Sequence, residues 1–168
     1  MRKGKAVRNK LVLAIDPGRH GGYAAAQLGR TWAGALAEAD GERAVLLAEL
    51  QAGAALEGQA VVCVLEKVGG FTGKGRPGSA MFNFGEGYGF LLGVLAALKV
   101  KVHLVTPQVW QKPLALGTRR ACASDTIWKR KLKEEAQRRF PHIKVTNANA
   151  DALLILEHAA CRMPEIFL

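Results

Sequence analysis

Residues 13–24 read LAIDPGRHGGYA, and this stretch decides the fold class. The apolar run from Leu11 to Ile15 predicts a buried strand, which the turn-forming Asp16-Pro17-Gly18 then ends. After Gly21-Gly22 an apolar stretch resumes from Tyr23 to Leu28, as the second strand of a hairpin would. We therefore expect the chain to open with a strand hairpin that carries an aspartate at its turn.

The remainder of the sequence alternates strand-like and helix-like segments. Short apolar runs bounded by Gly or Pro predict strands, and apolar residues at helical spacing predict helices. The expected elements are, in order, a helix over 40–51, a strand over 60–65, a helix over 79–98, a strand over 102–106, and helices over 125–140 and 150–161. This order is typical of an α/β fold in which helices cover a mixed sheet.

The charge balance favours an anionic partner. Lysine and arginine number 24 against 14 acidic residues, which gives a net charge of +10 and suits nucleic acid or an acidic membrane surface. The longest apolar runs, such as Phe90 to Leu98, are far shorter than the roughly 20 residues that a membrane span requires. We therefore expect a soluble protein without a membrane partner.

The length of 168 residues supports a single domain. We assign residues 11–168 to this domain and residues 1–10, MRKGKAVRNK, to a basic, flexible segment before it. That segment is interpreted as a DNA-binding arm, the remnant of a targeting sequence or an added terminus, and the sequence leaves all three open. Cys63, Cys122 and Cys161 lack C-x-x-C spacing, so we expect a reducing compartment rather than zinc or disulfides.

Three carboxylates stand at the ends of otherwise apolar segments. Asp16 follows the first strand, Glu66 ends the run VVCVL, and Asp151 opens the last helix. A charge in such a place is costly unless something binds it. Oxygen ligands suit magnesium or manganese, and two such ions can drive phosphodiester cleavage. Each residue also has a structural explanation, because Asp16 could cap a turn, Glu66 could pair with the next lysine, and Asp151 could cap its helix.

Taken together, the segments resemble the RuvC family of Holliday junction resolvases. The pieces that carry the resemblance are, in order, LAIDPGRHGGYA, VVCVLEKV, FNFGEGYGFLLGVLAAL, VTPQVWQK and NANADALLI. Within the family, the chloroplast (monokaryotic chloroplast) and phage-type resolvases look most similar. The resemblance implies an RNase H-like mixed five-stranded sheet flanked by helices. It also implies a homodimer that makes paired symmetric nicks in four-way junction DNA, with Asp16, Glu66 and Asp151 as catalytic ligands of two Mg²⁺ or Mn²⁺ ions.

One departure from the family lies just before the last helix. The family places another acidic residue three or four positions ahead of the final one, where this chain has Ala148 and Asn147. Asn147 is therefore a candidate catalytic position that offers a carbonyl oxygen but no charge, and we expect one metal ion to bind more weakly and catalysis to be impaired. The asparagine is either natural or an introduced substitution. His158, seven residues after Asp151, is a candidate extra ligand or a structural histidine.

We expect the DNA contacts to lie in a glycine-rich loop and in the basic second half of the chain. The loop at residues 69–79, GGFTGKGRPGS, contains G-x-G-x-x-G but does not leave its strand directly, so we expect no small-molecule cofactor. An ordinary solvated loop or helix face is the alternative reading of these residues. The expected DNA-binding residues are Phe71, Lys74, Arg76, Lys112, Arg119, Arg120, Lys129 and Lys131.

Apolar and small residues give two further expectations. Trp110 and Trp128 are assigned to the core, because large aromatic residues dominate core burial. Gly85, Gly89 and Gly93 recur every four residues and predict a smooth helical face. That face is interpreted equally as a dimer interface or as packing within one subunit.

These observations leave three functional hypotheses. The first is a dimeric, structure-selective, magnesium-dependent endodeoxyribonuclease. The second is a non-catalytic protein that binds four-way junctions, and the third is an RNase H-fold nuclease that acts on RNA–DNA hybrids. The alanine- and glycine-rich composition favours a chloroplast location, with a bacterial or phage-infected cytoplasm as the alternative.

Overall fold

The computed structural model describes residues 10–67, 69 and 78–168. At its centre lies a five-stranded mixed sheet with the strand order β3-β2-β1-β4-β5. The second strand in the chain, β2, is antiparallel to both of its neighbours, β1 and β3, whereas β1, β4 and β5 run parallel. The sequence-based expectation of a mixed five-stranded sheet is confirmed. The strands are β1 (Leu11–Ile15), β2 (Gly22–Gln27), β3 (Arg30–Ala35), β4 (Val61–Glu66) and β5 (Lys101–Val105).

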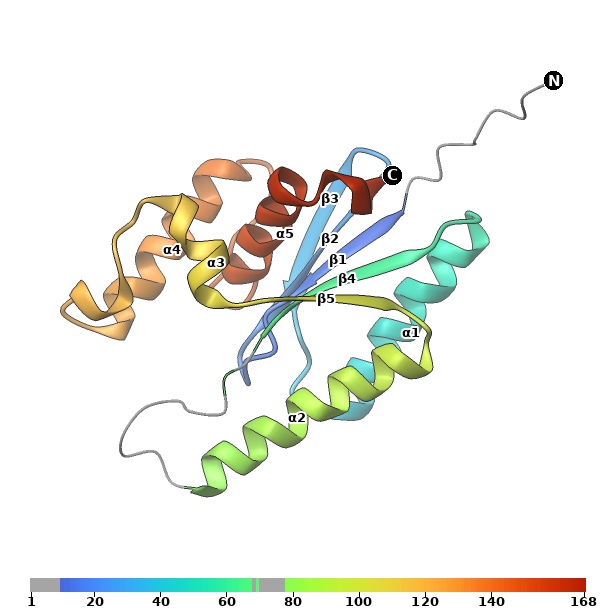
Figure 1. Ribbon diagram of the computed structural model, residues 1–168, viewed down its shortest axis with the longest axis horizontal. Helices are drawn as coiled ribbons and strands as arrows, with labels where there is room; N and C mark the ends of the chain where they lie inside the picture. Colours follow the sequence, from blue (N-terminus) through green and yellow to red (C-terminus); the bar gives the residue numbers. More distant parts are fainter. Residues whose placement is uncertain (1–9, 68, 70–77) are drawn as a thin grey trace.

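Helices cover both faces of this sheet (Figure 1). One face carries α1 (Asp40–Leu56) and α2 (Gly78–Ala97), and the other carries α3 (Pro107–Gln111), α4 (Asp125–Arg139) and α5 (Ala150–Arg162). Short 3-10 turns span Lys112–Leu114, Arg119–Ala121 and Pro164–Phe167. Within the described ranges, no helix is both long and apolar enough to cross a membrane.

The strand β1 is buried on both sides, which explains its continuous apolar run. Leu13 and Ile15 pack with residues of α1 and α2, whereas Val12 and Ala14 pack with residues of α4 and α5. Trp110 and Trp128 belong to the core on the side of α4 and α5. They are 0% and 3% exposed, so their assignment to the core is confirmed. The two cores fix β1 in the middle of the molecule.

Three elements differ from the expectation, and the first is the short helix α3, which was not among the expected elements. The fifth strand that the resemblance implied, β3, was not located in the sequence, because RTWAGA is short, half-exposed and without clear alternation, as is common for an edge strand. The helix α1 continues to Leu56 rather than ending at Gln51. Gly53 is tolerated there because the buried Ala54, one residue later, anchors the last turns to the core.

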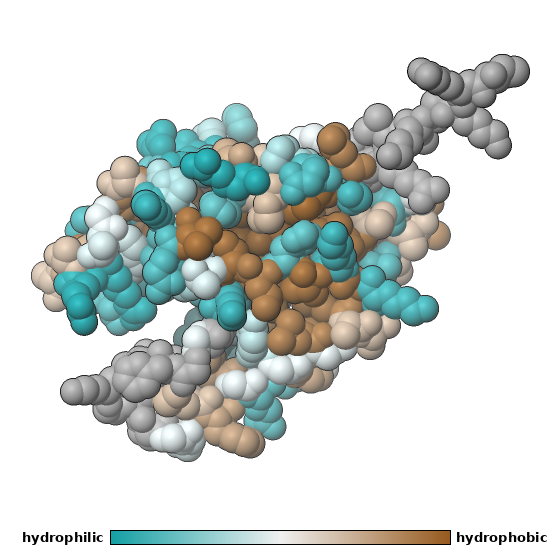
Figure 2. Space-filling view, viewed as in Figure 1, coloured by the Kyte–Doolittle hydropathy of each residue, from teal (hydrophilic) through white to brown (hydrophobic). Residues whose placement is uncertain are grey.

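The opposite edge of the sheet is β5, and Figure 2 shows an apolar area over it. Leu104 on this strand is 48% exposed, and Val109 on α3 is 53% exposed. Val105, at the carboxyl end of β5, pairs with Glu66, whereas Lys101 lies at the opposite end of this strand. The carboxyl ends of the parallel strands therefore form a separate region, which holds the site.

Candidate active site

The three predicted carboxylates line one pocket of about 750 Å³. Asp16 follows β1 and Glu66 ends β4, and these parallel neighbours pair in register at Ile15 and Leu65. The two acidic residues therefore leave the sheet side by side at the carboxyl ends of adjacent strands. Asp151 reaches the same pocket from the first turn of α5.

The loop after β1 shapes the position of Asp16. The backbone N–H of Gly18 donates a 3.0 Å hydrogen bond to Asp16 Oδ1, and that of Gly21 donates to the carbonyl of Gly18 at 2.9 Å. Gly22 then passes so close to the start of α5 that an added Cβ would lie 2.5 Å from the carbonyl oxygen of Ala148. The hairpin and the start of α5 are thereby locked together.

The segment before α5 is held by Asn149, which is 3% exposed. Its Oδ1 accepts a 2.8 Å hydrogen bond from Thr146 N, and its Nδ2 donates to the carbonyl of Lys144 at 3.3 Å. This turn places Asp151 in the pocket, where only 6% of the residue is exposed. The sequence offered no sign that Asn149 has this role.

Asp151 forms an ion pair with Lys129 of α4, whose Nζ lies 2.5 Å from Asp151 Oδ2. The other oxygen, Oδ1, is buried and has no hydrogen-bond partner among the described residues. A buried carboxylate oxygen without a partner is unfavourable in the absence of a ligand. Asp151 is therefore only half satisfied by the protein around it.

Glu66 is held by Trp110, whose Nε1 donates a 2.8 Å hydrogen bond to Glu66 Oε2. Burial, followed by repulsion from Asp16, raises the pKa of Glu66 to about 7, although the Trp110 hydrogen bond acts in the opposite direction. The sequence placed Trp110 in the core and did not identify this contact. Chemistry could have indicated such a contact, because the N–H of a buried indole usually requires a hydrogen-bond acceptor.

Electrostatic repulsion links the three acids. The pKa of Asp16 is raised by burial and then by the charge of Asp151, against the opposing effect of Lys129. Burial acts to lower the pKa of Lys129, but the charges of Asp151 and Asp16 outweigh it, and the pKa is raised. The ammonium group of Lys129 thus interacts with all three acidic groups, whose mutual proximity favours the binding of further positive charge between them.

The donor set matches a hard divalent cation, since carboxylate oxygens are what Mg²⁺ and Mn²⁺ prefer. The partnerless Asp151 Oδ1, the repulsion of Asp16 by Asp151 and the repulsion of Glu66 by Asp16 support the same match. Within the described ranges, no group of three or more His, Cys, Asp or Glu side chains already lies close enough together to hold a metal ion. Lys129 is the basic side chain of this pocket that forms an ion pair with Asp151. The metal-ligand roles of Asp16, Glu66 and Asp151 stay a prediction.

Basic side chains form the rim of the same pocket. Lys112, Arg119, Arg120 and Lys129 all line it, so the structure brings four of the expected DNA-binding residues together with the carboxylates. Arg119 also forms an ion pair with Asp125. Lys131 is exposed and does not line this pocket, and the expected contacts Phe71, Lys74 and Arg76 lie outside the described residues.

Asn147 does not line the carboxylate pocket, so the structure does not support its expected place beside the three acids. It is exposed and lines a neighbouring hollow with residues of α4. The expectation relied on the family pattern, which places an acid three or four positions ahead of Asp151, but α5 begins only at Ala150. Asn147 lies before the helix, in the turn closed by Asn149, and this turn places it outside the carboxylate pocket.

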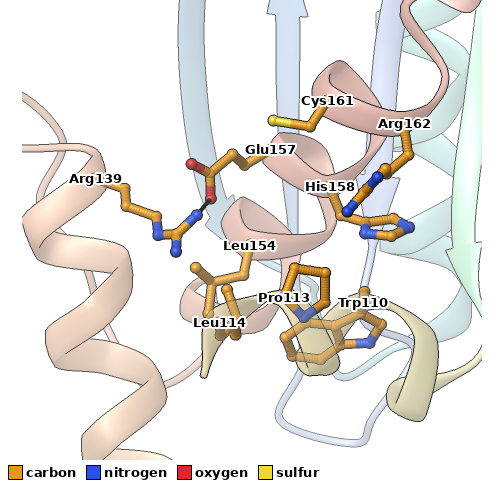
Figure 3. A pocket seen from close by; sticks show the side chains of 9 residues that line it. All are labelled: Trp110, Pro113, Leu114, Arg139, Leu154, Glu157, His158, Cys161 and Arg162. Carbon is orange, nitrogen blue, oxygen red and sulfur yellow. Dashed lines mark hydrogen bonds and ion pairs between the residues drawn. The ribbon is translucent and has the colours of Figure 1, made fainter. Parts of the chain in front are cut away.

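His158 is likewise not brought to the carboxylates. It points into a different hollow of about 200 Å³, where Trp110 and Arg162 also lie (Figure 3). Seven residues return to the same side of a helix but also advance by about 10 Å along its axis. That advance carries His158 away from Asp151. In its own hollow, burial and then the charge of Arg162 lower the pKa of His158.

The glycine face of α2 is open. A Cβ added at Gly85, Gly89 or Gly93 would meet no described atom within 4 Å, and all three glycines are exposed. Phe82, one turn earlier, is 69% exposed. The reading that this face packs within one subunit is therefore wrong for the part of the chain that the structure describes, and the dimer reading stays a prediction.

No protein-family model and no curated protein matches the sequence. Among solved structures, the RuvC structure from Thermus thermophilus is similar, with a TM-score of 0.54 and 18% identity over 94% of this chain and 97% of that one. T. thermophilus RuvC in complex with a Holliday junction substrate gives a TM-score of 0.55 and 18% identity over 92% and 96% of the two chains. At this identity the similarity concerns the fold. The chain has the RuvC fold, an RNase H-like mixed sheet with helices on both faces, as its sequence motifs predicted.

Proposed function

We propose that this protein is a magnesium-dependent endonuclease that resolves four-way DNA junctions by paired symmetric nicks. The observation that supports this most strongly is the joint placement of Asp16, Glu66 and Asp151 in one basic-rimmed pocket. The fold adds support, because a structure of similar fold is RuvC in complex with a Holliday junction substrate. A phosphodiester backbone suits such a rim, since each lysine or arginine neutralises phosphate charge.

In this proposal the three carboxylates hold the divalent ions. The chemistry that such ions supply when bound is activation of water and stabilisation of the leaving oxygen. Trp110 orients Glu66 through its indole N–H, and the loop bond from Gly18 orients Asp16. Lys129 balances the charge of Asp151 before the ions arrive. Lys112, Arg119 and Arg120 bind the DNA backbone at the rim of the pocket.

The proposal includes a homodimer formed through α2. Its glycine face is exposed, and Phe82 beside it leaves apolar surface without a partner in the described part of the subunit. A smooth face lets a second backbone approach closely, and a two-fold contact places the same patch on both subunits. Two carboxylate pockets related by this symmetry would address opposing strands of one junction.

A specific observation favours a second candidate function, a non-catalytic junction-binding protein. Neither Ala148 nor Asn147 supplies a fourth acid, and Asp151 is already paired with Lys129. A pocket with fewer acidic ligands binds divalent ions less strongly. Binding to junctions would then persist without cleavage.

Cleavage of a synthetic four-way junction by the full chain in Mg²⁺ tests these alternatives. We expect symmetric nicks in opposing strands, loss of nicking in Asp16→Asn with binding retained, and weak competition by linear duplex. Selective junction binding without nicks over a range of Mg²⁺ and Mn²⁺ concentrations would instead establish the binding protein. Cleavage of an RNA–DNA hybrid in preference to the junction would overturn the resolvase proposal in favour of an RNase H-type nuclease.

A further inference from the structure

A second polar hollow, of about 460 Å³, adjoins the carboxylate pocket. The two share Lys129, which lines both. The hollow lies between α4 and the turn that precedes α5. The residues that line it are Asp125, Thr126, Lys129, Arg130, Lys133 and Asn147.

The α4 side of this hollow is one continuous helical face. Thr126, Arg130 and Lys133 follow each other at spacings of four and three residues, which places them on the same side of a helix. Trp128, Leu132 and Ala136 face the core instead. Asn147 approaches from the other side, because the Asn149 turn keeps it outside α5. The helix and the turn thus present polar groups to one another.

The hollow is rich in hydrogen-bond donors. Within the described ranges, no hydrogen bond or ion pair is formed by the ammonium group of Lys133 or the side-chain amide of Asn147. Arg130 is held only by a loose 3.8 Å contact to Glu134, in which both side chains are more than two-thirds exposed. Such a pair adds little stability and leaves the guanidinium available to a ligand.

The acidic residue of the hollow, Asp125, does not cancel these donors. Arg119 approaches it with two nitrogens, Nε at 2.7 Å and Nη2, and so engages both of its carboxylate oxygens. Asp125 also stands in the first turn of α4, where the helix N-terminus is partially positive. A phosphate group is bound by clustered hydrogen-bond donors, such as those of lysine, arginine, amide and hydroxyl side chains.

We propose that this hollow binds a backbone phosphate of the DNA strand, next to the phosphate that is cleaved. The inference rests on the proposed nuclease function, because it takes the carboxylate pocket as the cleavage site. Lys129 borders both, so a strand that runs across it places one phosphate at the acids and a neighbouring one in the hollow. Asn147 is then a DNA contact rather than a metal ligand, and its lack of charge is what an anion site needs.

The test is junction binding by the full chain in EDTA, where no cleavage occurs. Asn147→Asp places a negative charge in the hollow and is expected to weaken junction binding about tenfold, with Asn147→Ala weakening it less. Lys133→Gln should reduce the slope of log affinity against log salt by about one. The matched control is Lys101→Gln, which removes the same charge at the far end of β5 and should keep the wild-type slope.

Two results would overturn the proposal. The first is stronger junction binding, or a higher Mn²⁺ affinity by calorimetry, in Asn147→Asp than in the wild type, because this is what a metal ligand at position 147 would produce. The second is an equal salt slope in Lys133→Gln and Lys101→Gln. The nuclease function fails separately, through an absence of nicks by the wild type in Mg²⁺, since the EDTA measurements do not depend on cleavage. Thermal unfolding of each variant checks that these substitutions leave the fold intact.

Discussion

Trp110 Nε1 donates a 2.8 Å hydrogen bond to Glu66 Oε2, which ties α3 to the end of β4. The indole is fully buried, so the bond fixes the direction of the carboxylate as well as its charge. Glu66 has a pKa raised to about 7 by burial and by Asp16, and the bond from Trp110 limits this rise. The pair therefore controls how readily Glu66 carries the negative charge that a metal site needs.

Removal of this bond should change the pH dependence of folding in metal-free protein. The folded-state pKa of Glu66, about 7, lies above its usual 4.5. The folded protein therefore holds this proton more tightly than the unfolded chain, and the free energy of unfolding is highest below pH 4.5 and falls as the pH rises to about 7. The loss is about 3 kcal/mol. In Trp110→Phe the pKa should rise further, and the loss should extend to higher pH.

Urea unfolding in EDTA at pH values from 4 to about 9 measures this effect. Glu66→Gln is the reference, because it removes the titrating group and should flatten this part of the profile. Parallel profiles for Trp110→Phe and the wild type would show that the indole does not influence the charge of Glu66.

The ion pair between Lys129 and Asp151 leads to a second prediction. Lys129→Met should lower the free energy of unfolding of the metal-free protein by about 2–4 kcal/mol, because it leaves the buried Asp151 without its cation. Added Mg²⁺ should then raise the melting temperature more in this variant than in the wild type. The double variant Lys129→Met with Asp151→Asn removes both charges and should recover much of the stability. An equal response to Mg²⁺ in wild type and Lys129→Met would mean that the lysine and the metal do not share Asp151.

Gly22 provides a third prediction, about how the hairpin positions α5. A Cβ at this residue would lie 2.5 Å from the carbonyl oxygen of Ala148 and 2.6 Å from that of Gly34. Both are backbone atoms that cannot rotate away, so Gly22→Ala should cost about 2 kcal/mol or more and displace the start of α5. Gly41→Ala is the control, because its Cβ would meet no described atom within 4 Å and alanine favours the helix α1. Differential scanning calorimetry should show opposite shifts in melting temperature, and equal shifts would contradict the close approach.

The exposed face of α2 provides a fourth prediction. Gly89→Arg should leave the subunit folded, since a side chain there meets no described atom within 4 Å, but should convert a dimer into a monomer. Sedimentation velocity measures the change. Gly53→Arg, an equally open glycine on α1, should leave the oligomeric state unchanged. A wild-type protein that sediments as a monomer at all concentrations would rule out the α2 dimer.

The sequence by itself determined the order of the main elements, the four long helices and most strands, because apolar periodicity and Gly or Pro punctuation are local properties. It also singled out Asp16, Glu66 and Asp151, charged residues at the ends of apolar segments, which the structure brings into one pocket. It missed β3, whose half-exposed edge sequence carries little pattern, and the five-residue helix α3.

Tertiary structure decided which groups meet. The register of β1 with β4 sets Asp16 beside Glu66, and the packing of α4 on α5 brings Lys129 to Asp151. Neither depends on sequence spacing, because both are contacts between elements far apart in the chain. The same reason explains why two other candidates lie in other hollows: Asn147, which the family pattern had grouped with Asp151, and His158, which helical spacing had grouped with it. The helix α5 begins after Asn147 and advances along its axis before it reaches His158, so neither residue shares the pocket of Asp151.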